Sequence, residues 1–225
     1  MSVDPDGAPF SLTRYRTLLA AARDAGYRPR GFAGGDPVAG DLLLRHDVDM
    51  SLEAAVRMAE LEHEEGVVAT YFLMTESVFY NLSSKVGRWA LGRLRELGHH
   101  VGHHGAWPTA AAAPGFGFEP VLAWHTPEPH YMALPVDGAL NVMDPRFTGD
   151  FTWTYRSDSN MAWRRGDPLA DLRAGRFPWL QLLVPPLLWV YPGATMRETM
   201  AAFLDDDRRI RWERLRDERI ELGEG

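Results

Sequence analysis

Two carboxylates stand two residues apart in the segment Arg45-His46-Asp47-Val48-Asp49. In an extended chain, side chains two positions apart point to the same side and lie about 6–7 Å apart. Both acids can therefore serve one site, one as a metal ligand and the other as a base. A second explanation is that they cap a helix starting near Ser51. His46 favours the site, because capping a helix requires no imidazole.

The densest group of potential metal ligands is Gly98-His99-His100-Val101-Gly102-His103-His104-Gly105. Two pairs of its histidines have the four-residue spacing with which a helix binds one metal ion. The glycines of the segment disfavour a helix, and in a strand residues four apart are separated by about 13 Å. We therefore expect one ligand from this segment, His104 at the end of a strand, with the other histidines in supporting or structural positions.

The composition limits the kinds of site and partner. The chain has 225 residues and no cysteine, so histidines and carboxylates must hold any metal ion. The net charge of −7 gives no field that would gather nucleic acid. Residues 1–10 lack the pattern of a secretion signal, and no apolar stretch approaches the ~20 residues of a membrane span. We therefore expect a cytoplasmic protein that neither binds nucleic acid nor inserts into a membrane.

The hydrophobic pattern predicts helices that alternate with buried strands. Helices are expected over about residues 11–26, 51–65, 88–97 and 197–222. Strands are expected at residues 42–44, 67–73, 99–103, 121–124, 151–155 and 180–184. This alternation predicts an α/β fold with a parallel sheet or barrel, in a single domain that spans residues 1–225.

Polar residues follow several of the predicted strands. In α/β barrels, the catalytic groups lie at the carboxyl ends of several strands, so such a series indicates a shared site. The residues in these positions are Asp47, Asp49, His104, His125, Arg156 and Asp158.

The segment 45–49, followed by Ala69-Thr70-Tyr71-Phe72 and by residues 97–104, resembles the polysaccharide-deacetylase family, also called the NodB-homology or carbohydrate-esterase-4 family. The branch with His-Asp-Val-Asp as its first motif is the most similar. The resemblance is specific over about residues 40–105 and weaker through Trp124-His125, residues 156–160, Trp163 and residues 180–183. It implies a distorted (β/α)7 barrel and a divalent metal ion, commonly zinc, with Co²⁺, Ni²⁺ or Mn²⁺ as alternatives.

By position, the resemblance implies that Asp47 is the base, Asp49 the metal-binding acid and His104 the first metal-binding histidine. Proline stands at two further positions of the family pattern, Pro108 in place of the second metal-binding histidine and Pro185 in place of the late catalytic histidine.

These departures leave two roles to be filled. We expect His125 to complete the metal set, with His130 and His103 in reserve. The proton for the leaving amine would come from His46, from His103 or from Asp47 returning the proton that it took.

Further residues are expected to contact the substrate or orient the base. Arg156 and Asp158 are assigned to the catalytic group, and His46, His103, Trp124 and Trp163 to substrate binding. The resemblance implies hydrolysis of an N-acyl amide, and the missing export signal favours an intracellular substrate, either a nucleotide- or lipid-linked amino sugar or another biosynthetic intermediate.

Two alternatives remain open. The domain can be a degenerate relative that binds a ligand or partner without turnover, which the two prolines motivate. It can also be an unrelated α/β protein with an accidental histidine cluster. The oligomeric state is not predicted.

Overall fold

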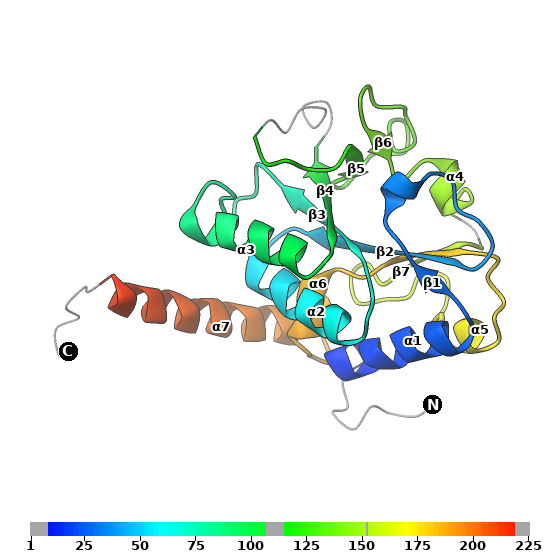
Figure 1. The fold of residues 1–225 in the computed structure, drawn as a ribbon. Coiled ribbons are helices and arrows are strands. Elements are labelled where there is room, and N and C mark those ends of the chain that lie inside the picture. Colours follow the sequence, from blue (N-terminus) through cyan, green and yellow to red (C-terminus); the bar gives the residue numbers. More distant parts are fainter. Residues whose placement is uncertain (1–8, 107–114, 152, 219–225) are drawn as a thin grey trace.

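A parallel sheet forms the centre of the computed structural model, which describes residues 9–106, 115–151 and 153–218 (Figure 1). All pairs of strands in it run parallel. A short strand, β1 (Arg28–Pro29), pairs with β2 at one end. The main strands are β2 (Asp41–Val48), β3 (Thr70–Met74), β4 (His100–Gly105), β5 (Val121–Trp124), β6 (Leu140–Asn141), β7 (Tyr155–Ser157) and β8 (Leu180–Leu183).

The order of the main strands across the sheet is β6-β5-β4-β3-β2-β8-β7. Read as a circle, this is the order of the chain, with one unpaired seam between β6 and β7 in the described residues. The sheet is curled into a half-barrel. The prediction of an α/β fold with a parallel, barrel-like sheet is confirmed, and the curl is compatible with a distorted barrel.

Side-chain bonds connect the two sides of this seam. Gln181 on β8 donates from Nε2 to the carbonyl oxygens of Val142 and Phe147, at 3.0 and 2.7 Å. Val142 directly follows β6 and Phe147 lies in the short helix α4 (Pro145–Thr148). A buried amide on β8, the neighbour of the edge strand β7, therefore contacts the chain that follows the other edge strand, β6.

The longer helices begin at the residues that the sequence indicates. Ser11, Ser51 and Thr195 accept hydrogen bonds from backbone N–H groups in the first turns of α1, α2 and α7, which satisfies donors without a partner inside the helix. No helix in the described ranges combines the length and the apolar character needed to cross a bilayer. The helices are α1 (Leu12–Asp24), α2 (Leu52–Glu64), α3 (Lys85–Glu96), α5 (Leu169–Arg173), α6 (Pro186–Val190) and α7 (Met196–Asp217), with a 3-10 turn at Phe32–Gly34.

Most of the predicted elements are present, with one error that matters for the site. The four predicted helices correspond to α1, α2, α3 and α7, although residues 219–222 of the last lie outside the described residues. The strand predicted at 151–155 is wrong, because β7 begins only at Tyr155. Asp150 and Phe151 have left-handed φ values of 55° and 56°, so the chain turns where a strand was expected. The strands β1 and β6 and the helices α4, α5 and α6 were not predicted.

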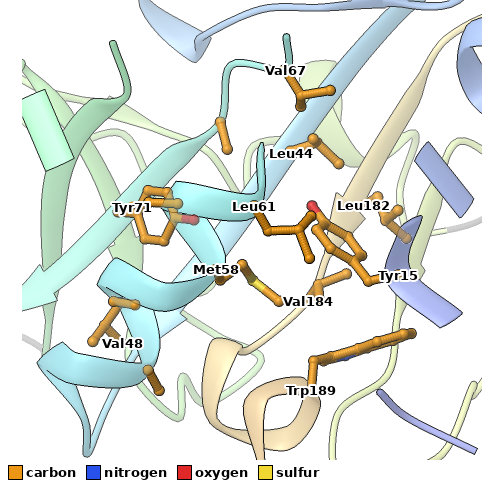
Figure 2. Packing of buried hydrophobic residues seen from close by; sticks show 14 of the residues in the cluster. Tyr15, Leu44, Val48, Met58, Leu61, Val67, Tyr71, Leu182, Val184 and Trp189 are labelled. Carbon is orange, nitrogen blue, oxygen red and sulfur yellow. The ribbon is translucent and has the colours of Figure 1, made fainter. Parts of the chain in front are cut away.

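Side chains of β2 alternate between two cores. Leu43 joins a cluster inside the half-barrel with Phe32, Phe72 and Phe147. Leu44 and Val48 join the larger cluster between the sheet and the helices, where Figure 2 shows them near Tyr71, Leu61 and Met58. Odd-numbered residues of β2 therefore face the interior of the half-barrel and even-numbered residues face the helices.

A buried polar cluster lies within the larger core. The carboxylate of Glu62 on α2 accepts hydrogen bonds from Tyr15 Oη at 2.5 Å, from Tyr71 Oη at 2.6 Å and from His46 Nε2 at 2.7 Å. His46 Nδ1 lies 2.6 Å from the carbonyl oxygen of Val184, so both ring nitrogens face acceptors and His46 carries a proton on each. The cluster joins α1, α2, β2 and β3 through a buried ion pair.

Candidate metal centre

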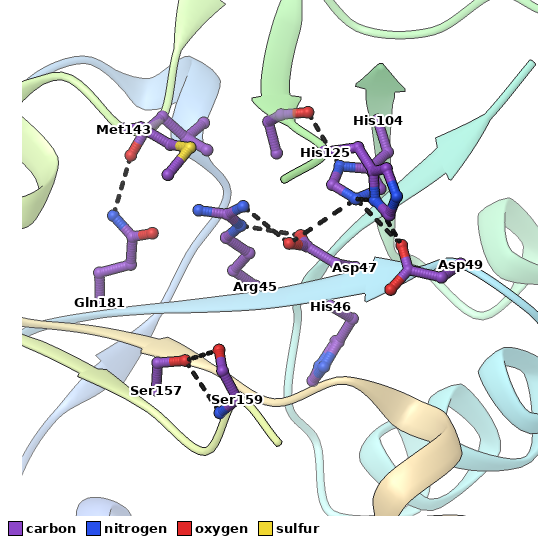
Figure 3. Close-up of polar contacts among 12 residues, drawn as sticks. Arg45, His46, Asp47, Asp49, His104, His125, Met143, Ser157, Ser159 and Gln181 are labelled. Atoms are coloured by element: carbon purple, nitrogen blue, oxygen red, sulfur yellow. Dashed lines mark hydrogen bonds and ion pairs between the residues drawn. The ribbon is translucent and has the colours of Figure 1, made fainter. Parts of the chain in front are cut away.

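Three potential metal ligands converge at the carboxyl ends of three strands (Figure 3). Asp49 follows β2, His104 lies at the end of β4 and His125 follows β5. Asp49 Oδ1 is 3.1 Å from His104 Nε2 and 3.3 Å from His125 Nδ1. The two imidazole nitrogens are 3.2 Å apart. The sequence predicted these three ligands, and the fold brings them together.

The contacts within this cluster fit a bound divalent cation. His104 Nδ1 lies 2.9 Å from the carbonyl oxygen of Ala123. With a cation bound, His104 would donate its Nδ1 proton there and offer the lone pair of Nε2 to the ion. Ligands 2.0–2.1 Å from a tetrahedral zinc ion are about 3.3–3.4 Å from one another, close to the three distances found here. The donor set of two imidazoles and one carboxylate suits zinc and other first-row divalent ions.

Electrostatics keep the carboxylate ionised. Burial alone would raise the pKa of Asp49, but the contacts and positive charge of His104 and His125 outweigh burial and hold that pKa below its ordinary value. The contact with Asp49 raises the pKa of His125, against its partial burial. A divalent cation would replace the proton that these groups share in its absence.

Asp47 lies beside the three ligands and is held by Arg45. Arg45 Nε and Nη2 donate to the two carboxylate oxygens of Asp47 at 2.8 and 2.7 Å. Asp47 Oδ2 is 4.0 Å from His104 Nε2. The Arg45 side chain is 2% exposed, so the carboxylate of Asp47 is held by a buried, bidentate contact. Arg45 was missed in the sequence, although it has the same alternation along the strand as Asp47 and Asp49.

These residues line a pocket of approximately 920 Å³. That volume is in the upper part of the range of about 300–1,000 Å³ found for small-molecule sites. Arg45, Asp47, Asp49, His104 and His125 all contribute to its wall. The cluster is therefore open to a ligand of considerable size.

Unusual backbone conformations border the same pocket. Thr126, Phe151 and Asn160 line it and have φ values of 44°, 56° and 60°. The other described non-glycine residues with positive φ, Asp150 and Met161, are their sequence neighbours. Such conformations cost about 1–3 kcal/mol each and concentrate at functional sites.

His46 does not face the pocket, which corrects its assignment to substrate binding. It lies between Arg45 and Asp47 on β2, so alternation turns it to the opposite side of the strand (Figure 3). Its side chain is fully buried and bonded to Glu62 and Val184. The role of this histidine is structural.

The two reserve histidines are also away from the metal ligands. His103 points out of the half-barrel, where Nε2 contacts Thr75 Oγ1 at 3.2 Å and the ring stacks on Phe118. It is not in the wall of the pocket. His130 is exposed and lies 3.5 Å from Glu128. His103 therefore lies away from the pocket where substrate binding was expected of it, and His125 is the histidine that joins His104.

Arg156 and Asp158 were assigned to the catalytic group, and neither lines the pocket. Arg156 donates to the carbonyl oxygens of Trp153 and Tyr155 and lies over the rings of Trp153 and Phe177. Because β7 begins at Tyr155, alternation directs Tyr155 and Ser157 into the pocket and sends Arg156 outward. The arginine that contacts Asp47 is Arg45.

Asp158 is fully buried next to Trp189, whose Nε1 donates to Asp158 Oδ2. Burial raises the pKa of Asp158 to about 7, although the bond from Trp189 and the charge of His46 lower it. Oδ1 has no hydrogen-bond partner among the described residues, as fits a carboxyl group that is often protonated. Asp158 belongs to the core.

The two tryptophans assigned to substrate binding have different positions. Trp124 lines the pocket, as predicted, although it is almost wholly buried. Trp163 packs against Phe10 and Trp189, with ring centroids 6.2 Å from each, and does not line the pocket. Its assignment is corrected to packing.

The two prolines can be placed only in part. Pro185 lines the pocket at the end of β8, where the resemblance implies a catalytic histidine. Pro108 lies outside the described residues. Comparison of the chain with protein-family models, with curated proteins and with solved structures gave no match.

Proposed function

We propose that this protein is a metal-dependent amidohydrolase that removes an acyl group from an amine. The observation that carries the proposal is the meeting of Asp49, His104 and His125 in one pocket with a fourth group, Asp47, beside them. A structural metal site needs no such neighbour, whereas hydrolysis needs a base next to the metal ligands.

Asp49, His104 and His125 would hold the metal ion. Three protein ligands leave coordination positions open, which is typical of catalytic sites. When bound, a divalent ion of this kind acts as a Lewis acid that lowers the pKa of water and polarises a carbonyl group. Zinc is our first candidate, with Co²⁺, Ni²⁺ and Mn²⁺ as alternatives.

Asp47 is proposed as the base. It takes a proton from water as the water oxygen forms a bond to the acyl carbon. The C–N bond then breaks and the products are a carboxylic acid and an amine. Arg45 keeps both oxygens of Asp47 in place through two charge-assisted hydrogen bonds, so little rearrangement is needed at the moment of proton transfer.

The amine must receive a proton as it leaves. Of the three donors considered from the sequence, His46 and His103 lie outside the pocket and Asp47 lies inside it. Asp47 therefore returns to the nitrogen the proton that it took from water. This single-residue shuttle compensates for Pro185, which cannot transfer a proton.

A second candidate function is ligand binding without turnover. Pro185 favours it, because a proline occupies the part of the pocket where a second proton-transfer group is expected. Loss of such a group typically costs 10²–10⁴-fold in rate.

Metal analysis combined with an amine-release assay tests the proposal. The purified protein is stripped with a chelator, supplied with Zn²⁺ and incubated with a panel of N-acylated amines, including N-acetylated sugars. We expect about one ion per chain and amine release that requires the ion, with release lost in Asp47→Asn while the metal remains. Bound metal without release from any substrate favours the second candidate, and failure to bind any divalent metal contradicts both the cofactor and the reaction.

A further inference from the structure

The wall of the pocket is rich in flexible apolar side chains. Five of the nine methionines in the chain line it. They come from the turn after β2, from the loops on either side of β6 and from α7, which are far apart in the sequence. Methionine is unbranched and polarisable, so a wall of this kind adapts to apolar groups of varied shape. The methionines are Met50, Met132, Met143, Met196 and Met200.

The rest of the wall supports the same chemistry. Phe151, Leu187 and Leu188 extend the apolar surface between the methionines. Uncharged polar side chains also line the pocket, but they are fewer than the apolar ones; they are Ser51, Thr126, Tyr155, Ser157, Ser159 and Asn160. The wall is thus better suited to an apolar group than to a sugar chain.

Two arginines lie at the edge of this pocket. Arg164 and Arg165 line it, are exposed, and make no ion pair or hydrogen bond with any other described side chain. Among the described residues, the carboxylates in the wall are Asp47 and Asp49, which already contact Arg45 and the imidazoles. The chain has a net charge of −7, yet the two charged side chains of the pocket without an ion pair to a described residue are both arginines. This indicates an anionic ligand.

We propose that the substrate is an acylated amine with an apolar group, which lies against the methionine wall, and an anionic group, which Arg164 and Arg165 bind. This inference rests on the proposed function for the position of the scissile bond, but its binding chemistry can be measured separately. The anion can be a carboxylate or a phosphate, because a guanidinium group recognises both through paired N–H donors.

Ligands without an amide bond test the binding chemistry apart from any turnover. The probes are nonanoate and octyl phosphate as apolar anions, acetate and inorganic phosphate as anions alone, octyl glucoside as a neutral apolar molecule, and the tetramer of N-acetylglucosamine. Affinities are measured by calorimetry on the zinc-loaded full chain, below the micelle concentration. We expect nonanoate or octyl phosphate to bind at least tenfold more tightly than all other probes, and the stronger of the two identifies the anion.

Two variants connect this preference with the residues. In Arg164→Ala/Arg165→Ala, the advantage of the apolar anion over octyl glucoside should fall about tenfold. In Met200→Glu, a charge within the apolar wall should weaken both alkyl probes by tenfold or more. Arg216→Ala, an exposed arginine on α7 away from the pocket lining, removes one positive charge as a control and should leave all affinities unchanged.

Several outcomes would overturn the inference. One is tighter binding of the sugar tetramer, and another is equal affinity for charged and neutral alkyl probes. A third is a loss of affinity as large in Arg216→Ala as in the double variant. If the probes bind as expected but no amide is cleaved, the proposed reaction is wrong and the inferred ligand chemistry stands.

Discussion

Arg45 and Asp47 point to the same side of β2 and are joined by two hydrogen bonds, Nε to Oδ1 at 2.8 Å and Nη2 to Oδ2 at 2.7 Å. The pair lies next to the metal ligands, with Asp47 4.0 Å from His104. One strand thus supplies both the proposed base and the group that orients it, within three residues.

The first prediction concerns this pair. Arg45→Lys keeps the positive charge but cannot make the paired contact, so Asp47 should lose its fixed orientation. We expect kcat for amide hydrolysis to fall about 10–100-fold with little change in KM, while the metal content stays unchanged. Steady-state kinetics and metal analysis check this. Unchanged kcat would show that Asp47 needs no such support.

The second prediction separates the metal ligands from nearby histidines. His125→Ala removes one of three ligands, and we expect zinc affinity to fall at least about 100-fold, with hydrolysis falling in parallel. His130→Ala serves as the matched control, because this histidine is exposed and pairs with Glu128, away from the cluster. Competition with a chromophoric chelator gives both affinities. Equal affinities in the two variants would remove His125 from the site.

The third prediction concerns the buried ion pair behind the site. Glu62→Gln leaves His46 without its counter-ion in a fully buried position. Removing one partner of a buried pair costs about 3–5 kcal/mol, so the free energy of unfolding should fall by that amount. Glu64→Gln, on the same helix but exposed, should cost less than about 1 kcal/mol. Urea denaturation followed by circular dichroism measures both, and similar losses would contradict the importance of the pair.

The fourth prediction is a pH dependence. Burial raises the pKa of Asp158 to about 7, above its ordinary value of 3.8, so the folded state holds a proton that the unfolded state has released. Between about pH 4 and 7 this residue's contribution to stability must fall as the pH rises, by on the order of 2–4 kcal/mol in total.

Asp158→Asn tests this dependence because the amide cannot ionise. Relative to wild type, the variant should gain free energy of unfolding as the pH rises from 5 to 8. Asp137→Asn, an exposed residue, should show a constant difference from wild type over the same range. A parallel pair of curves for Asp158→Asn and wild type would contradict the raised pKa.

The sequence predicted the candidate metal ligands better than the residues around them. The reason lies in the alternation of side chains along a strand. The motif around Asp47 and Asp49 is embedded in a long strand, so the direction of its side chains follows from their spacing. His104 lies at the end of β4 and His125 follows β5, and the ends of both strands were predicted within two residues. The local sequence pattern was therefore sufficient to predict the candidate metal ligands.

Arg156 and Asp158 were expected at the site, but neither lines the pocket. A strand expected at 151–155 would have placed both residues beyond its carboxyl end. The turn at Asp150 and Phe151 moves the start of β7 to Tyr155, and alternation then directs the two charged side chains away from the pocket. A shift of a few residues in one strand changed which side chains the pocket receives.

The pocket wall could not be predicted from the sequence. Its methionines lie between positions 50 and 200, and no local pattern connects them. Only the curled sheet and the return of α7 bring them together.

The two-sided character of β2 also limits how this protein can evolve. The strand pairs with both β3 and β8, and this pairing sets its register. Arg45 lies opposite Thr70 on β3 and Leu183 on β8. A single inserted or deleted codon within the strand would exchange its faces, presenting Leu44 and Val48 to the metal ligands and pressing charged groups against the helices. Point substitutions within one face are tolerable by comparison. Outside the residues of the site, the segment can therefore change in composition but not in length.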